Sequence, residues 1–189
     1  MKTQYTPEGF IPKHGGYNDL ITYQKAEILY DGTYYFCEKY LEKYDRTKDQ
    51  MIQAARSGKQ NIAEGSMISA TSKESEIKLT NVARASLEEL FIDYKDFLRT
   101  RGLIFWDKNH KYYKALTKLH KTPNFTYETY RKGIESPDPE VSANVLASLT
   151  NTTSFLLAQQ LKVLEKEFLE NGGLRENMYQ ARIKHRKNF

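Results

Sequence analysis

The sequence predicts an all-α protein: an antiparallel up-down four-helix bundle with an inserted short helix between helices 3 and 4 and a basic C-terminal tail. Apolar residues recur at steps of three and four in four long segments, which indicates amphipathic helices. No segment keeps the two-residue alternation typical of a strand. The first two connections are short, which favours antiparallel neighbours. We expect a flexible N-terminal arm over residues 1–16, a bundle domain over 17–172 with an insertion at 103–139, and a basic suffix over 173–189.

The first two long helices differ in the size of their inward residues. The first begins near Asn18, and its predicted stripe is Tyr23, Ala26, Tyr30, Tyr34, Cys37, Leu41 and Tyr44. The second follows a capping-box pattern, Thr47 with Gln50. Its predicted inward residues are Met51, Ala54, Ala55, Gly58, Ile62 and Ala63. Most of these side chains are small, which lets another backbone approach closely. Gly65 is expected near its end.

The third and fourth long helices flank the insertion. A capping-box pattern, Thr71 with Glu74, opens a helix over about 72–101, with Ile77, Thr80, Ala83, Leu87, Leu90, Tyr94, Phe97 and Arg101 on one face. Asp107 is expected to cap a short helix that ends by His120. Residues 122–140 contain three of the five prolines and predict a linker. The last helix runs over about 140–170, with Val145, Leu149, Thr152, Leu156, Val163, Leu164 and Phe168 inward.

Composition restricts the compartment and the partners. The single cysteine, Cys37, excludes an internal disulfide and is expected to be a buried packing residue. No apolar run is long enough for a signal peptide or a membrane span, so we expect a cytoplasmic protein without membrane contact. The basic residues are concentrated in the tail, where Glu176 is the one acidic residue: Arg175, Arg182, Lys184, Arg186 and Lys187. The other 173 residues hold 24 basic and 23 acidic side chains, a net charge of only +1.

The motifs of the common enzyme classes are missing. A di-iron bundle needs two Glu-x-x-His pairs, and the chain has none. Asp107 and His110 have the i, i+3 spacing but form a single pair on the short helix. There is no phosphate-binding glycine loop and no Gly-x-Ser-x-Gly. The Arg-to-His spacing found in helical nucleases of toxin systems is also missing. We therefore expect a non-enzymatic protein with no metal and no cofactor.

Two basic stretches are candidates for nucleic-acid binding. The segment "RIKHRK" at 182–187 would neutralise phosphates without reading sequence, although a solvated tail that aids solubility explains it equally well. The segment "DKNHKYYK" at 107–114 interleaves lysine with tyrosine, as phosphate contacts and base stacking require. Lysines on the outer face of a short helix are the commoner explanation.

Two motifs carry a family resemblance. The run Asn61–Gly65 ("NIAEG") and the run Ala83–Leu90 ("ARASLEEL") resemble the four-helix-bundle proteins encoded by intervening sequences of bacterial 23S ribosomal RNA genes. The resemblance covers roughly residues 18–101 and 140–170. The ending "ENGGLRENMYQARIKHR" is similar to the suffix on a subset of these proteins.

The resemblance implies a bundle that forms rings, commonly homopentamers, and no established enzymatic activity. A related branch, the accessory variability proteins of diversity-generating retroelements, resembles the same fold with a basic surface that engages reverse transcriptase and nucleic acid. The near-neutral body of this chain departs from that branch. Its long insertion also departs from the shorter family pattern.

The first motif contains polar residues on a helix of small and apolar ones. Asn61 and Glu64 are three residues apart and share one side of the helix. The polar run Arg84, Ser86 and Glu89 on the next helix offers partners. We expect a hydrogen-bonded network that joins the two helices near their bend, because buried polar groups are usually satisfied internally. A ligand site is the alternative.

The leading functional prediction is a self-assembling protein that binds RNA, DNA or a nucleic-acid-handling protein. The aromatic residues exceed what one bundle interior needs, and aromatic residues are enriched at interfaces. Packing of the short helix and the linker onto the bundle is the other explanation for these rings. One alternative is a purely structural protein–protein scaffold. Another is an enzyme whose site is shared between subunits and uses residues such as Glu64, Arg84 and Glu89.

Overall fold

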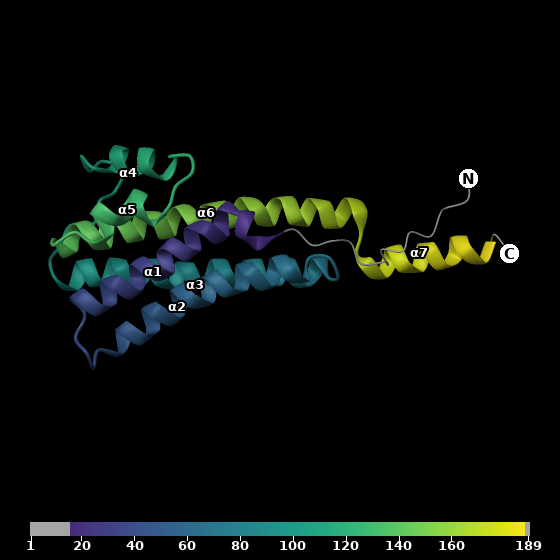
Figure 1. The fold of residues 1–189 in the computed structure, drawn as a ribbon, viewed down its shortest axis with the longest axis horizontal. Helices are drawn as coiled ribbons and strands as arrows, with labels where there is room; N and C mark the ends of the chain where they lie inside the picture. The colour runs from purple at the N-terminus through teal and green to yellow at the C-terminus, as the bar shows by residue number, and fades with distance from the viewer. Residues whose placement is uncertain (1–15, 188–189) are drawn as a thin grey trace.

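The computed structural model describes residues 16–187, except for the side chains at positions 181, 184, 185 and 187. All regular structure in this part of the chain is helical. The elements are η1 (Tyr17–Asp19), α1 (Ile21–Tyr40), α2 (Arg46–Ile68), α3 (Lys73–Thr100), α4 (Tyr113–His120), α5 (Tyr127–Ile134), α6 (Pro139–Asn171) and α7 (Leu174–Lys187). The long helices α1, α2, α3 and α6 pack antiparallel as a helical bundle (Figure 1). The predicted arm over residues 1–16 lies, apart from Gly16, outside the described residues.

Small residues bring α2 and α3 together, as the sequence predicts. Gly58 is buried, and a Cβ atom there would lie 2.7 Å from a methyl carbon of Leu87. Gly65 lies near the end of α2, as predicted, and the helix continues for three more residues to Ile68. A Cβ atom at Gly65 would lie 3.5 Å from the carbonyl oxygen of Glu76. This is an ordinary van der Waals distance, so the close packing of α2 and α3 requires a glycine at Gly58 rather than at Gly65.

An aromatic cluster forms the core between α1 and α3. Phe36 packs edge-on against Tyr94 and Phe97, with ring centroids 5.2 and 4.7 Å apart. The Tyr94 ring is completely buried, and its hydroxyl lies 2.9 Å from the Thr33 hydroxyl. This hydrogen bond satisfies the polar end of a side chain that otherwise contributes apolar packing.

The stripe predicted for the first helix is correct in part. Cys37 is completely buried, as predicted, and burial raises the pKa of its thiol to about 12. Tyr34 and Tyr44 are 51% and 89% exposed, so their predicted inward position is wrong. A tyrosine tolerates a boundary position that a periodic pattern alone does not distinguish from the core.

The predicted inward faces of the other long helices are mostly buried. All six positions predicted for α2 are buried. On α3 the predicted positions from Thr80 to Phe97 are buried, whereas Arg101 is exposed and its guanidinium lies 4.0 Å from the Phe97 ring centroid. On α6 the predicted inward Val163 is wrong, since its side chain is 56% exposed.

Three helix starts lie one or more residues from their predicted caps. Asp45, rather than Thr47, caps α2 by accepting from the Thr47 amide at 2.9 Å. Ser72, rather than Thr71, caps α3 through the Ser75 amide. The short helix α4 begins at Tyr113, and Asp107 accepts from the Asn109 amide in the preceding turn. Short polar side chains compete for such caps, so sequence places a helix start only approximately.

The predicted linker over residues 122–140 contains a helix, α5. A capping box between Thr126 and Thr129 opens it, and its Tyr130 and Ile134 are buried. The prolines that suggested a linker lie outside α5, and Pro139 occupies the first turn of α6. The helix docks on α6 and α1, with these two side chains buried.

The insertion, α4 and α5, packs on the bundle at the end away from α7, against α6 and, through α5, α1 (Figure 1). Lys25 of α1 is 2% exposed beneath it. Its ammonium donates to the His120 carbonyl at 3.3 Å and to the Tyr130 hydroxyl at 3.2 Å, and lies 3.8 Å from the Phe125 ring centroid. Burial lowers the pKa of Lys25 to about 8. The insertion is thus fastened by a buried polar cluster.

The C-terminal helix α7 leaves the bundle. Gly172 has a φ of 64°, a left-handed conformation that glycine adopts readily and that ends α6. The predicted suffix is helical, since α7 covers Leu174–Lys187. This helix extends away from the helix bundle (Figure 1). Among the described residues, no helix is long and apolar enough to cross a membrane.

Candidate functional site

The structure brings together two of the five residues predicted to form a polar network. The Asn61 side chain donates to the Ser57 carbonyl at 2.8 Å and to the Ser57 hydroxyl at 3.1 Å. The Ser57 hydroxyl lies 3.0 Å from the hydroxyl of Ser86 on α3. Ser57, which the sequence interpretation missed, therefore links Asn61 to Ser86 at the border of α2 and α3.

The other three predicted network residues lie outside it. Glu64, Arg84 and Glu89 are exposed. Arg84 donates to the side chain of Asn81, on its own helix, at 3.2 Å. The expected five-residue network is therefore reduced to a serine–asparagine bridge. The charged groups stay in water, which avoids the cost of burying them.

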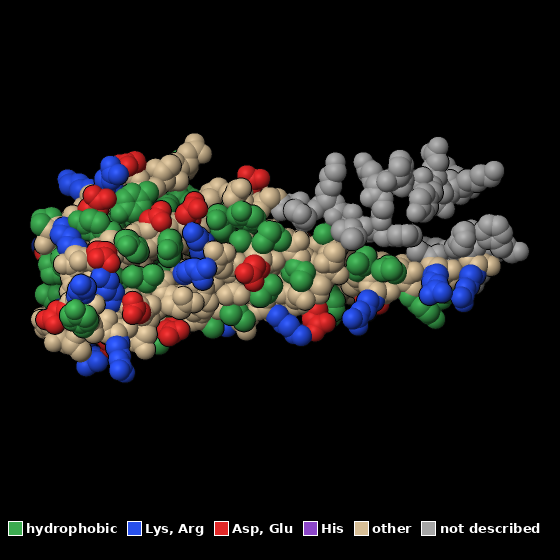
Figure 2. Space-filling view, turned by 60° about the horizontal axis from the view of Figure 1, so that its bottom comes forward, with side chains coloured by type: hydrophobic (Ala, Val, Ile, Leu, Met, Phe, Trp, Pro, Cys, Tyr) green, Lys and Arg blue, Asp and Glu red, His purple; other side chains and the backbone are tan. Residues whose placement is uncertain are grey.

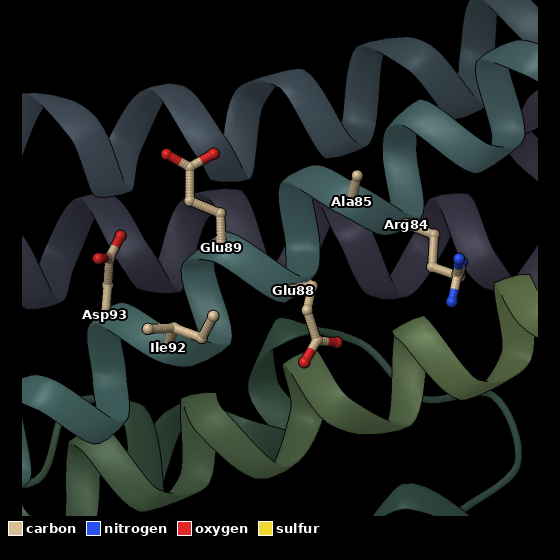
Figure 3. A pocket seen from close by; sticks show the side chains of 6 residues that line it. All are labelled: Arg84, Ala85, Glu88, Glu89, Ile92 and Asp93. Carbon is tan, nitrogen blue, oxygen red and sulfur yellow. The ribbon is translucent and has the colours of Figure 1, made fainter.

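A shallow depression of about 470 Å³ lies on the outer side of α3. It is lined by Arg84, Ala85, Glu88, Glu89, Ile92 and Asp93. Figure 3 shows that all of these side chains come from α3, with Glu89 directed toward α2 and Glu88 toward α6. Because the two carboxylates diverge, they do not form a shared ligand set. Within residues 16–187, no group of three or more described His, Cys, Asp or Glu side chains is arranged to hold a metal ion.

Asp93 has the most unusual environment in this depression. Burial, followed by the charges of Glu89 and Asp96, raises the pKa of Asp93 to about 6. Its Oδ2 atom is buried and has no hydrogen-bond partner among the described residues. This carboxyl group can therefore take up a proton near pH 6.

Three of the five tail residues predicted to bind nucleic acid lie on one side of α7, together with Tyr179. Arg175, Tyr179, Arg182 and Arg186 follow at steps of four, three and four residues, which places them along one face, and all four are exposed. Figure 2 shows Lys and Arg side chains along this helix, whereas both signs of charge alternate over the visible face of the bundle. The side chains of Lys184 and Lys187 are outside the part of the chain that the structure describes.

A rigid loop at the start of the insertion was missed by the sequence interpretation. Trp106 is 7% exposed. Its backbone amide donates to the Asn144 side chain at 2.7 Å, and its indole N–H donates to Glu140 at 3.1 Å. Asn144 also donates to the Ile104 carbonyl at 2.8 Å. These contacts join segments that lie far apart in the chain, which no local pattern reveals.

Comparison with protein-family models, curated proteins and solved structures gives no match. The resemblance to the intervening-sequence proteins therefore stays a prediction that depends on Asn61–Gly65 and Ala83–Leu90. Support for a function comes from the geometry of the described residues.

Proposed function

We propose that this protein is a non-enzymatic, self-associating up-down four-helix bundle that acts by binding, in the cytoplasm, to nucleic acid or to a nucleic-acid-handling protein. The observation that carries this proposal is the exposed face of α7 formed by Arg175, Tyr179, Arg182 and Arg186. A guanidinium group forms two parallel hydrogen bonds with a phosphate, and an exposed tyrosine ring stacks on a base.

The dimensions of α7 suit a polyanion. With a rise of 1.5 Å per residue, the three arginines extend over about 16 Å, which spans several phosphates of a strand. A 14-residue helix is marginally stable by itself in water, and among the described residues no other helix packs extensively against α7. A bound partner would therefore stabilise α7 as well as neutralise it.

Self-association is supported by large apolar side chains that remain exposed on α3 and α6. These are Val82, Ile92, Phe155, Val163 and Leu169. Exposed apolar side chains of this size can supply the apolar core of an interface. The resemblance implies a homopentameric ring. Native mass spectrometry of the full chain is expected to give one closed oligomer, and a monomer at micromolar concentration would contradict this part of the proposal.

A protein–protein scaffold is the second candidate, favoured by the depression on α3. Glu88, Glu89 and Asp93 make that surface acidic, which repels nucleic acid and suits a basic protein. Purification of the protein with one stoichiometric protein and no nucleic acid would favour the scaffold. An enzyme with a site between subunits, built from residues such as Glu64, Arg84 and Glu89, would instead show activity in a nuclease assay.

The basic face of α7 is tested by measuring RNA binding against salt concentration. We compare the full chain, a chain that ends at Gly173, and the full chain with Arg175, Arg182 and Arg186 changed to Gln. Both changes are expected to weaken binding strongly and to reduce its salt dependence, while the circular-dichroism spectrum stays helical. A matched control changes Lys43, Lys162 and Lys166, which are exposed on the bundle, to Gln. Equal binding by all proteins would reject the proposal.

A further inference from the structure

The insertion contains a second concentration of positive charge. Residues 107–121 hold five lysines and one acidic residue, Asp107, so their net charge is +4: Lys108, Lys111, Lys114, Lys118 and Lys121. The rest of residues 1–173 carries 19 basic and 22 acidic side chains, a net charge of −3. The nearly neutral total predicted for the body of the protein therefore conceals a strongly basic segment.

The fold places these lysines on the outside of the insertion. Leu116 is buried and Leu119 is half-buried, whereas Lys114, Lys118 and Lys121 are exposed. Lys114 and Lys118 are four residues apart on the outer face of α4, and Lys121 follows three residues later at its C-cap. Lys108 and Lys111 are exposed in the turn that precedes the helix. The turn and α4 together expose five lysines, which we call the lysine surface.

These lysines differ in their partners from several lysines of the bundle. Lys48 pairs with Glu38 at 2.7 Å, and Lys73 pairs with Glu76 at 3.0 Å. None of the five lysines forms an ion pair with a residue that the structure describes. Lys111 instead lies 4.8 Å from the ring centroid of Tyr112. Their charges are thus available to an external anion.

An aromatic platform adjoins the lysine surface. His110 stacks on Trp106 with centroids 5.0 Å apart and an interplanar angle of 9°. Tyr112 lies 4.9 Å from Trp106 and 5.4 Å from His110, and it is 45% exposed. The hydrogen bonds to Glu140 and Asn144 fix Trp106 beneath these rings. An exposed ring that is held in place binds with a smaller loss of conformational entropy than a mobile one.

We propose that the insertion is a second binding surface, specific for single-stranded nucleic acid, in which the lysines of residues 108–121 contact phosphates and Tyr112 stacks on a base. Unpaired bases are needed for stacking, which distinguishes a single strand from a duplex. An acidic protein would use the lysines but would not need the platform. The surface lies at the end of the bundle away from α7, so it functions even if α7 binds nothing (Figure 1).

The lysine contribution is tested in the full chain by changing Lys114, Lys118 and Lys121 to Gln. The probe is a fluorescent oligouridine, and its anisotropy is measured at several salt concentrations. The slope of log K against log salt is expected to fall by about 2, since each phosphate contact on a single strand contributes about 0.7. The Lys43, Lys162 and Lys166 variant removes the same charge elsewhere and is expected to keep the slope. Equal slopes for both variants would overturn the proposal.

The aromatic contribution is tested with Tyr112→Ala and Tyr112→Phe. Loss of one stacked base is expected to weaken oligouridine binding about 5- to 150-fold for the alanine variant, and phenylalanine should restore it. Tyr44→Ala, at an 89% exposed position outside the insertion, is the matched control. Polyglutamate serves as the second probe. If the lysine variant weakens polyglutamate binding and Tyr112→Ala changes neither probe, the surface binds acidic protein and the proposal fails.

A truncated variant that ends at Gly173 distinguishes the contributions of the two basic surfaces to binding. This truncated protein is expected to retain binding of oligouridine that depends on Tyr112. If truncation removes all binding, the insertion is not an independent surface and this inference fails, while the proposal for α7 stands. If truncation changes nothing, the α7 proposal fails and this one stands.

Discussion

The interface between α2 and α3 and the interface between the insertion and the bundle are built in different ways. Gly58 and its small neighbours bring α2 and α3 into apolar contact. The insertion is fastened by polar groups, with Trp106 bonded to Glu140 and Asn144, and Lys25 bonded to His120 and Tyr130. The first interface depends on hydrophobic burial, whereas the second combines buried side chains such as Tyr130 and Ile134 with polar groups that include the titratable Lys25. The insertion should therefore separate from the bundle under conditions that leave the bundle folded.

The largest expected effect is on the bundle. Leu90 is fully buried on α3, so Leu90→Ala should lower the free energy of unfolding by about 3 kcal/mol through lost burial and a residual cavity. Urea denaturation followed by circular dichroism measures this loss. A loss below about 1 kcal/mol would show that the core of the bundle is not packed as described.

Acid should release the insertion first. Burial, followed by the charge of Lys25, lowers the pKa of His120 to about 4. A histidine whose folded pKa is lowered opposes folding once it is protonated, so stability is lost as pH falls from about 6.5 toward 4, by about 2 kcal/mol after allowing for solvent screening of this partly exposed side chain. Trp106 is the only tryptophan, so its fluorescence reports on the insertion. His120→Gln should remove this transition, and an unchanged transition would contradict the assignment.

The buried ammonium of Lys25 makes the stability of the docked insertion depend on pH a second time, in the same direction but at higher pH. Because the pKa of Lys25 is lowered to about 8, folding favours its neutral form relative to the unfolded chain. Stability of the docked insertion should therefore rise as pH increases from about 8 toward 10, and Lys25→Met should remove that rise. Hydrogen exchange of residues 104–121 measures the docking. A rise that persists in Lys25→Met would assign the effect to another group.

Removing one amide should loosen the insertion by a smaller amount. Asn144→Ala deletes the acceptor of the Trp106 amide and the donor to the Ile104 carbonyl. We expect the local stability of residues 104–112 to fall by about 1–2 kcal/mol, which makes their hydrogen exchange faster. The exchange of α2 and α3 should stay unchanged. Equal acceleration across the whole chain would show that the insertion and the bundle unfold together.

The smallest expected effect is a gain in stability. The pKa of Asp93 is raised to about 6, so its ionised form is disfavoured in the folded state. Asp93→Asn should therefore increase stability by about 1 kcal/mol at a pH above about 7, allowing for solvent screening, and the gain should disappear near pH 4. Thermal denaturation at both pH values measures the difference, and a variant that is less stable at the higher pH would refute it.

The contrast between the α2–α3 interface and the docked insertion also explains which features the sequence predicts. Periodicity identifies the inward face of α2 and most of α3, because small and apolar residues there pack against neighbouring helices. It fails for Tyr34, which is exposed, and for Lys25, which is buried, because packing at a boundary decides both positions. The hydrogen bonds from Trp106 join distant parts of the chain and leave no local signal. The basic tail and the lysine-rich stretch at 107–114 are both visible in the sequence, whereas the alignment of Lys114 and Lys118 requires the bounds of α4.

The most direct test of the account is ultraviolet crosslinking of single-stranded RNA to the full chain, with the crosslinked residues identified by mass spectrometry. The account places RNA on the exposed rings beside the two basic surfaces, so crosslinks are expected at Tyr179 of α7 and at Tyr112 of the insertion. The exposed Tyr34 and Tyr44, outside both surfaces, are the internal controls and should remain free. Crosslinks confined to those control tyrosines, or a complete lack of crosslinks, would contradict it.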